Sequence, residues 1–180
     1  MVLIALGANL ASSVGAPAET IAEAIAELSK RGMKIAAKSR FFATPAWPDP
    51  SDPPFVNAVI RVETSLSSAA VMNLLHEIES AYGRTRSVKN APRTLDLDLI
   101  DFDGRIEDGP PMLPHPRVAE RAFVLIPLAD VAPHWRHPVS GKMIEQLIAA
   151  LPDRERTAVR PLLADSVFTP SGAERIGPDE

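Results

Sequence analysis

Residues 92–100 read PRTLDLDLI, and this stretch combines a strand pattern with two carboxylates in a fixed relation. Successive side chains of a strand point to opposite faces, so the three leucines share one face and Asp96 and Asp98 share the other. The two Asp Cβ atoms are then about 7 Å apart, twice the rise per residue. Asp is depleted in strands, so a leucine alternation this regular predicts that the two carboxylates are held in position.

The segments before this stretch predict the rest of a sheet. Residues 2–6 (VLIAL) are apolar throughout, which predicts a central strand buried on both faces. Residues 33–41 alternate with a period of two and predict another strand. The same period in residues 55–63 predicts one face with Val56, Ala58, Ile60 and Val62 and an opposite face with Phe55, Asn57, Arg61 and Glu63.

Two amphipathic helices are predicted between these strands. Pro17 suits a first helical position, and Ile21, Ile25 and Leu28 recur with helical spacing until Gly32. Ser67 can cap a second helix, whose apolar stripe is Val71, Leu74, Leu75, Ile78 and Tyr82. The order strand, helix, strand, strand, helix, strand predicts an α+β fold with a ferredoxin-like βαββαβ core.

Extra C-terminal helices are expected over residues 117–132 and 143–151. Residues 152–180 are polar, aperiodic and contain proline, which predicts a loosely attached tail. We therefore expect one domain over residues 1–151 followed by a tail over residues 152–180.

Composition excludes several classes of protein. The 180 residues are 46% hydrophobic and 23% charged, as in globular proteins, so disordered and coiled-coil classes are excluded. The chain has no Cys, which excludes thiolate chemistry and suits a reducing, cytoplasmic compartment. A net charge of −4 argues against nucleic-acid binding. The longest apolar run is too short to span a membrane, and no basic residue precedes it as in a signal peptide.

The paired carboxylates indicate a metal site. Two like charges on one patch are unfavourable without compensation, and Mg²⁺ prefers such hard oxygen ligands. The alternative is a solvated strand face that carries two Asp by chance.

Basic residues cluster near the carboxylates and indicate an anion. Residues 84–93 contain Arg84, Arg86, Lys89 and Arg93 without an acid. A metal-bound polyphosphate requires both Arg donors and Mg²⁺, whereas a solvated basic loop is the alternative. His115, Arg117 and Arg121 can add phosphate donors or serve as ordinary surface residues. Glu79, at the margin of its helix stripe, can contact a ligand or pair with Arg84.

Phe55 and Asn57 on one strand face suit a flat heterocycle with a hydrogen-bonding edge, and Phe123 can form an opposite wall. Packing under the proline-rich residues 45–54 is the alternative for Phe55. The chain contains neither a P-loop motif nor H-E-x-x-H.

Six motifs over residues 3–133 together resemble the 6-hydroxymethyl-7,8-dihydropterin pyrophosphokinase family of folate biosynthesis. They are LGANL, ATPAWP, FVNAVIRVET, IESAYGRTR, APRTLDLDLI and LPHPRVAERAFVLIPLADVAP. The resemblance implies transfer of a diphosphate from ATP to a pterin alcohol by a monomer, with release of AMP and no nucleic-acid or membrane partner.

The resemblance also implies roles for particular residues. Two Mg²⁺ ions would be held by Asp96 and Asp98, with Arg84 and Arg93 also catalytic. The ATP contacts would be Glu79, Arg84, Arg86, Arg93, His115 and Arg121. The pterin contacts would be Thr44, Pro45, Trp47, Phe55, Asn57 and Phe123.

Some positions depart from the family pattern. Ala46 and Pro116 replace a Pro and a Tyr of some members, Phe55 replaces a Tyr but preserves stacking, and the basic loop lacks a Trp that is often present. Two other readings stay open: a phosphohydrolase with an Asp nucleophile, and a non-catalytic ferredoxin-like metabolite-binding module.

Overall fold

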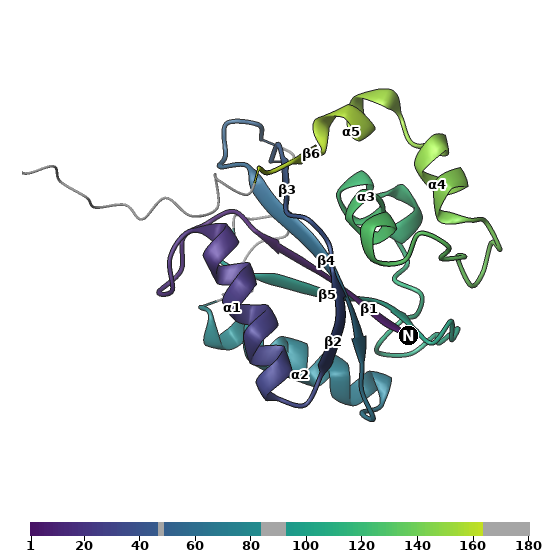
Figure 1. Ribbon diagram of the computed structural model, residues 1–180, viewed down its shortest axis with the longest axis horizontal. Helices are drawn as coiled ribbons and strands as arrows, with labels where there is room; N and C mark the ends of the chain where they lie inside the picture. Colours follow the sequence, from purple (N-terminus) through teal and green to yellow (C-terminus); the bar gives the residue numbers. More distant parts are fainter. Residues whose placement is uncertain (47–48, 84–92, 164–180) are drawn as a thin grey trace, which may run out of the picture.

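An antiparallel sheet flanked by helices on both faces forms the protein (Figure 1). The computed structural model describes residues 1–46, 49–83 and 93–163. Its elements are β1 (Val2–Ala8), α1 (Pro17–Lys30), β2 (Lys34–Lys38), β3 (Phe42–Thr44), β4 (Phe55–Glu63), α2 (Ser68–Ala81), β5 (Asp96–Phe102), the 3-10 helix η1 (Val118–Glu120), α3 (Ala122–Val131), α4 (Ile144–Ala150), α5 (Asp153–Ala158) and β6 (Arg160–Pro161). Across these three ranges, no helix is both long enough and apolar enough to span a bilayer.

The strand order confirms the ferredoxin-like core. The sheet runs β5-β1-β4-β3-β6, and β2 pairs with the C-terminal half of β4. The strand expected over residues 33–41 is therefore split into β2 and β3, which pair with different parts of β4. Ser39 lies at the break, where its backbone N–H donates to Val59 and its hydroxyl accepts from the Val59 N–H at 2.9 Å. The serine side chain thus continues the pairing where the regular ladder stops.

Strand β1 is buried along its whole length, as its apolar sequence predicts. One of its faces packs on α1 and α2 through a core that includes Ile4, Leu6, Ile21 and Leu75. Its other face packs on α3 and α4 through a second core that includes Leu3, Val59, Leu125 and Leu128. The sheet is therefore the middle layer of three.

The helix predictions are confirmed with one adjustment. Ser67 caps α2, and its hydroxyl accepts from the Ala70 N–H at 3.2 Å. The helix expected over residues 117–132 is divided, because η1 precedes α3 and Arg121 between them has extended backbone. That break aims the side chains before and after it toward the same end of the sheet.

The prediction of a loose tail is wrong for residues 152–162. Strand β6 pairs with β3, and the Leu162 N–H donates to the Phe41 carbonyl at 2.8 Å. Val159 is buried in the second core. Without β6, the backbone groups of β3 that face away from β4 would be unpaired. The two residues of β6 pair with them. Figure 1 shows α5 and β6 beside β3 and above α3.

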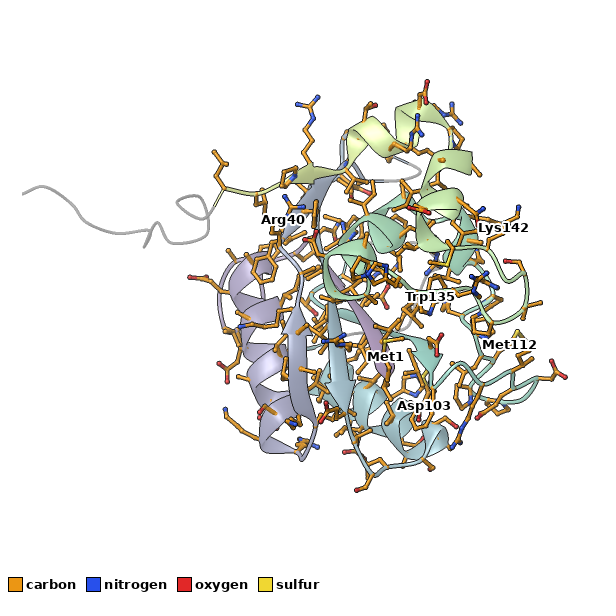
Figure 2. The ribbon with its side chains drawn as sticks, turned by 45° about the vertical axis from the view of Figure 1, so that its right-hand side comes forward. Met1, Arg40, Asp103, Met112, Trp135 and Lys142 are labelled. Carbon is orange, nitrogen blue, oxygen red and sulfur yellow. The ribbon has the colours of Figure 1, made fainter. Side chains whose placement is uncertain are left out.

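The strand that carries the aspartates is anchored at its far end. Asp101 is buried, and its carboxylate accepts from Trp135 Nε1 and from the Gly104 N–H, both at 2.7 Å. The N-terminal ammonium pairs with Asp103 just beyond, and Figure 2 labels Met1, Asp103 and Trp135 on this side of the molecule. These contacts fix β5 against β1 and the helix layer.

Candidate active site

A cavity of about 780 Å³ lies over one end of the sheet, a volume within the range of small-molecule sites. It is bounded by the sheet on one side and by residues of α3 and α5 on the other. Its lining includes Gly7, Thr44, Pro45, Ala46, Phe55, Asn57, Arg93, Asp96, Asp98, Arg117, Glu120, Arg121, Phe123, Arg154, Glu155 and Ala158.

The β5 side of the cavity carries the paired carboxylates. The leucines of the motif are buried in the first core, and Asp96 and Asp98 point the other way, into the cavity. Arg93 Nη1 donates to Asp96 Oδ2 at 2.8 Å, and Arg121 Nη1 donates to Asp98 Oδ2 at 3.0 Å. The negative charge of each aspartate is thus compensated by an arginine, and the two arginines come from different parts of the chain.

His115 lies beside Asp98 and Arg121. Its Nδ1 accepts the Arg117 N–H at 3.1 Å, and its Nε2 lies 3.5 Å from Arg121 Nη1. Nε2 is 3.8 Å from Asp98 Oδ2. Burial lowers the pKa of His115 below its ordinary value, and Arg121 lowers it further against the opposing effect of Asp98. His115 is therefore a neutral imidazole at neutral pH.

Glu79 lies behind the aspartates. It is 1% exposed on α2, and its Oε1 accepts the Leu97 N–H at 2.7 Å. Leu97 separates the two aspartates on the edge strand β5, so this bond holds the backbone between them. The predicted contact of Glu79 with ATP stays a prediction.

The β3 side of the cavity is neutral. Asn57 Nδ2 donates to Thr44 Oγ1 at 2.9 Å, and both residues are buried. A Cβ on Gly7 would lie 3.2 Å from Asn57 Oδ1, closer than ordinary side-chain contacts. Glycine at position 7 and threonine at position 44 therefore set the position of the Asn57 amide.

Two aromatic side chains also line the cavity. Phe55 precedes Asn57 by two residues on the same face of β4, as predicted. Phe123 is in the first turn of α3, 39% exposed, and the Arg121 guanidinium lies 5.6 Å from its ring centroid. A half-exposed aromatic ring at a cavity provides a surface for a flat ligand.

Asn9 connects the two sides. Its Oδ1 accepts the Arg93 N–H at 2.8 Å, and its Nδ2 donates to the Pro53 carbonyl at 3.1 Å. Asn9 thus ties the start of the aspartate strand to the proline-rich loop. The pattern LGANL after the first strand contains both Gly7 and Asn9, but their roles depend on contacts across the sheet that the sequence does not reveal.

The structure brings most of the predicted site residues together. Those that line the cavity are Thr44, Pro45, Phe55, Asn57, Arg93, Asp96, Asp98, Arg121 and Phe123. Trp47, Arg84 and Arg86 lie outside the described residues. Sequence reasoning missed Gly7, Asn9 and the α5 residues Arg154, Glu155 and Ala158.

The chain is similar in sequence to a known family and to named proteins. A family model described as 7,8-dihydro-6-hydroxymethylpterin-pyrophosphokinase (HPPK) matches residues 3–133. A Synechocystis protein named 2-amino-4-hydroxy-6-hydroxymethyldihydropteridine pyrophosphokinase is 38% identical over 156 residues, which are 86% of this chain and 78% of that protein. The protein of the same name from Pseudomonas aeruginosa is 37% identical over 154 residues, 84% of this chain and 91% of that protein.

The fold is similar to solved structures. The structure of Plasmodium falciparum HPPK-DHPS matches 82% of this chain with a TM-score of 0.59 and 14% identity, a likeness of fold alone. This chain spans 44% of that longer protein.

Proposed function

This chain belongs to the 7,8-dihydro-6-hydroxymethylpterin-pyrophosphokinase family, and on that premise we propose that the cavity is where it transfers the diphosphate of ATP to the hydroxymethyl group of the dihydropterin. The reaction is a step of folate biosynthesis and releases AMP. The observation that carries the proposal is a single cavity with arginine-paired carboxylates on its β5 side and a buried amide with two aromatic rings elsewhere in its lining.

The neutral side of the cavity suits the pterin. Asn57 presents an amide whose oxygen can accept from a ring N–H or an exocyclic amine, and its position is set by Thr44. Phe55 and Phe123 offer apolar faces for the bicyclic ring. Pro45 also lines this part of the cavity, and we assign Trp47 and the backbone of Thr44 to the pterin site on the family resemblance.

The charged side suits the triphosphate of ATP. Arg93 and Arg121 present guanidinium groups in the cavity, and we assign the adjacent His115 to the same site on the family resemblance. Phosphate oxygens accept strongly from such donors. We assign Arg84, Arg86 and Glu79 to the same nucleotide site on the family resemblance.

The donor set on β5 fits Mg²⁺. Asp96 and Asp98 supply hard carboxylate oxygens, and the described part of the chain has no group of three or more His, Cys, Asp or Glu side chains that could hold a metal ion together. Mg²⁺ typically takes one or two protein carboxylates and completes its shell with water and phosphate oxygens. When bound, two such ions would neutralise charge on the phosphates.

The protein's own part in the transfer is positioning and charge compensation. The pterin hydroxyl attacks the β-phosphorus in line, the bond between that phosphorus and the oxygen bridging to the α-phosphate breaks, and AMP leaves. Arg93 and Arg121 lie where negative charge accumulates, and alignment of two bound substrates contributes about 7 to 11 kcal/mol.

We also propose that the enzyme acts as a monomer, as the family resemblance implies, and that it works in a reducing, cytoplasmic compartment, which suits a chain without Cys.

Product analysis tests the proposal. AMP and a diphosphorylated pterin should appear only when ATP, Mg²⁺ and the pterin alcohol are all present. Inorganic phosphate in place of AMP would identify a phosphohydrolase, and binding without turnover would identify a metabolite-binding module.

A further inference from the structure

Helix α5 contributes three residues to the cavity from a segment that lies beyond the part matched by the family. The family match ends at residue 133, whereas Arg154, Glu155 and Ala158 belong to residues 153–158. Ala158 is four positions from Arg154 and three from Glu155, and residues spaced by three or four positions are neighbours on a helix surface. The cavity-facing side of α5 is therefore a coherent surface.

The opposite side of α5 is occupied by local contacts. Arg156 pairs with Asp153 and contacts the Ala149 carbonyl, and the Thr157 hydroxyl donates to the Asp153 carbonyl at 2.9 Å. Strand β6 then fixes the segment by pairing with β3. These contacts hold α5 in place and leave its other face turned to the cavity.

The position of α5 identifies the side of the cavity that it covers. In the sheet order, β5 with the two aspartates is at one edge and β6 is at the other. Four strand spacings separate them, about 19 Å. Strand β3, which carries Thr44, is the direct neighbour of β6. Helix α5 therefore enters the cavity from the β3 side, away from the aspartates.

Arg154 differs from the other arginines of the cavity. Arg93 pairs with Asp96, Arg121 with Asp98, and Arg117 with Glu120. Within residues 1–46, 49–83 and 93–163, Arg154 forms no ion pair with an acidic side chain, and it is exposed to solvent where it lines the cavity. Its guanidinium donors can therefore exchange water for a ligand, and a heterocycle with a carbonyl oxygen and ring nitrogens offers acceptors.

We infer that α5 is a wall of the pterin site and that Arg154 is a further substrate-binding residue that donates to acceptor atoms of the heterocycle. This inference rests on the proposed function. It assigns pterin recognition to a segment outside the family match, with Ala158 as the small residue that leaves room for the ring.

Substitutions on α5 and β6 test the inference. Arg154→Ala should raise the KM for the pterin at saturating Mg²⁺-ATP by about tenfold, because hydrogen bonds to a charged donor are lost, and leave the KM for ATP unchanged. Ala158→Leu should also weaken pterin binding, because the larger side chain takes space from the cavity. Arg160→Ala is the matched control, since it removes the same charge from the exposed strand β6 outside the cavity.

Calorimetric titration of the pterin in the presence of a non-hydrolysable ATP analogue gives the same comparison without turnover. A pterin affinity that is equal in the unmodified protein, Arg154→Ala and Ala158→Leu would overturn the inference, as would a loss confined to ATP. If the unmodified protein releases no AMP from ATP and the pterin, the proposed function itself is refuted. Normal AMP release with the same pterin KM in all variants refutes only the role of α5.

Discussion

The β5 and β3 sides of the cavity hold their side chains by different interactions. On the β5 side, Asp96 and Asp98 are each paired with an arginine, and their side chains remain 25% and 30% exposed. On the β3 side, Asn57 and Thr44 are joined by a neutral hydrogen bond and are 5% and 8% exposed. One side presents charge near solvent, and the other presents a buried amide in a fixed orientation.

This difference teaches which substrate each side suits. Partly exposed ion pairs contribute little to stability, so the four charges of the β5 side are free to exchange partners when phosphate and metal bind. A buried amide that is already hydrogen-bonded loses little freedom on binding, so it can select among heterocycles by their donor pattern. The following predictions are ordered by the size of the expected effect.

The largest effect is expected from Asp96→Ala and Asp98→Ala. Each should lower turnover by about 10³-fold, because the carboxylates are the proposed metal ligands. The folded state should change little in stability, since each variant loses one partly exposed ion pair and relieves repulsion between the aspartates. Thermal melts without metal should be close to that of the unmodified protein, and Mg²⁺-ATP should stabilise only the unmodified protein. Near-normal turnover of either variant would refute the metal assignment.

Arg93→Ala should lower kcat/KM by about 10²-fold, the effect of removing one donor from a site of charge accumulation. Both the KM for ATP and kcat should change, because Arg93 lies at the start of β5 and faces the ligand before and during transfer. Steady-state kinetics with each substrate varied in turn measures the two constants. A change confined to the KM for the pterin would contradict the assignment of Arg93 to the nucleotide side of the cavity.

Asn57→Ala should weaken pterin binding by roughly 1 to 3 kcal/mol, because polar atoms of the buried ring lose a partner. Affinity for Mg²⁺-ATP should stay the same. Calorimetry with each ligand decides the prediction. Impaired nucleotide binding with normal pterin binding would contradict it.

Thr44→Val should have a smaller effect, about 1 kcal/mol on pterin affinity, because the variant keeps the shape of the side chain and removes only the acceptor of the Asn57 amide. The released amide can then rotate, so discrimination between the pterin and an analogue without the exocyclic amine should also decrease. Thr44→Ser retains the hydroxyl, so it should keep the pterin affinity and the discrimination of the unmodified protein. Equal discrimination in all three proteins would mean that Thr44 does not orient Asn57.

The sequence predicted which side chains share a face of a strand, but it did not predict which side chains of neighbouring strands meet. Alternation with a period of two placed Asp96 with Asp98 and Phe55 with Asn57, and both pairs line the cavity. The Thr44–Asn57 hydrogen bond could not be predicted, because it depends on the antiparallel register of β3 against β4.

Helix α5 was missed for a different reason. Its six residues, DRERTA, contain no apolar stripe, so neither helical periodicity nor polarity distinguished them from a tail. Tertiary contacts of the following residues, including the pairing of β6 with β3, give the segment its structure. Trp47, Arg84 and Arg86 stay predictions from the family resemblance.

The most direct test of the two-sided cavity is one calorimetric comparison of Asp98→Asn and Asn57→Ala with both ligands. Mg²⁺-ATP is titrated alone, and the pterin is titrated with a saturating non-hydrolysable ATP analogue. The account predicts that Asp98→Asn loses affinity for Mg²⁺-ATP while Asn57→Ala keeps it and loses affinity for the pterin. Equal losses of Mg²⁺-ATP affinity in both variants, or the reverse pattern, would contradict it.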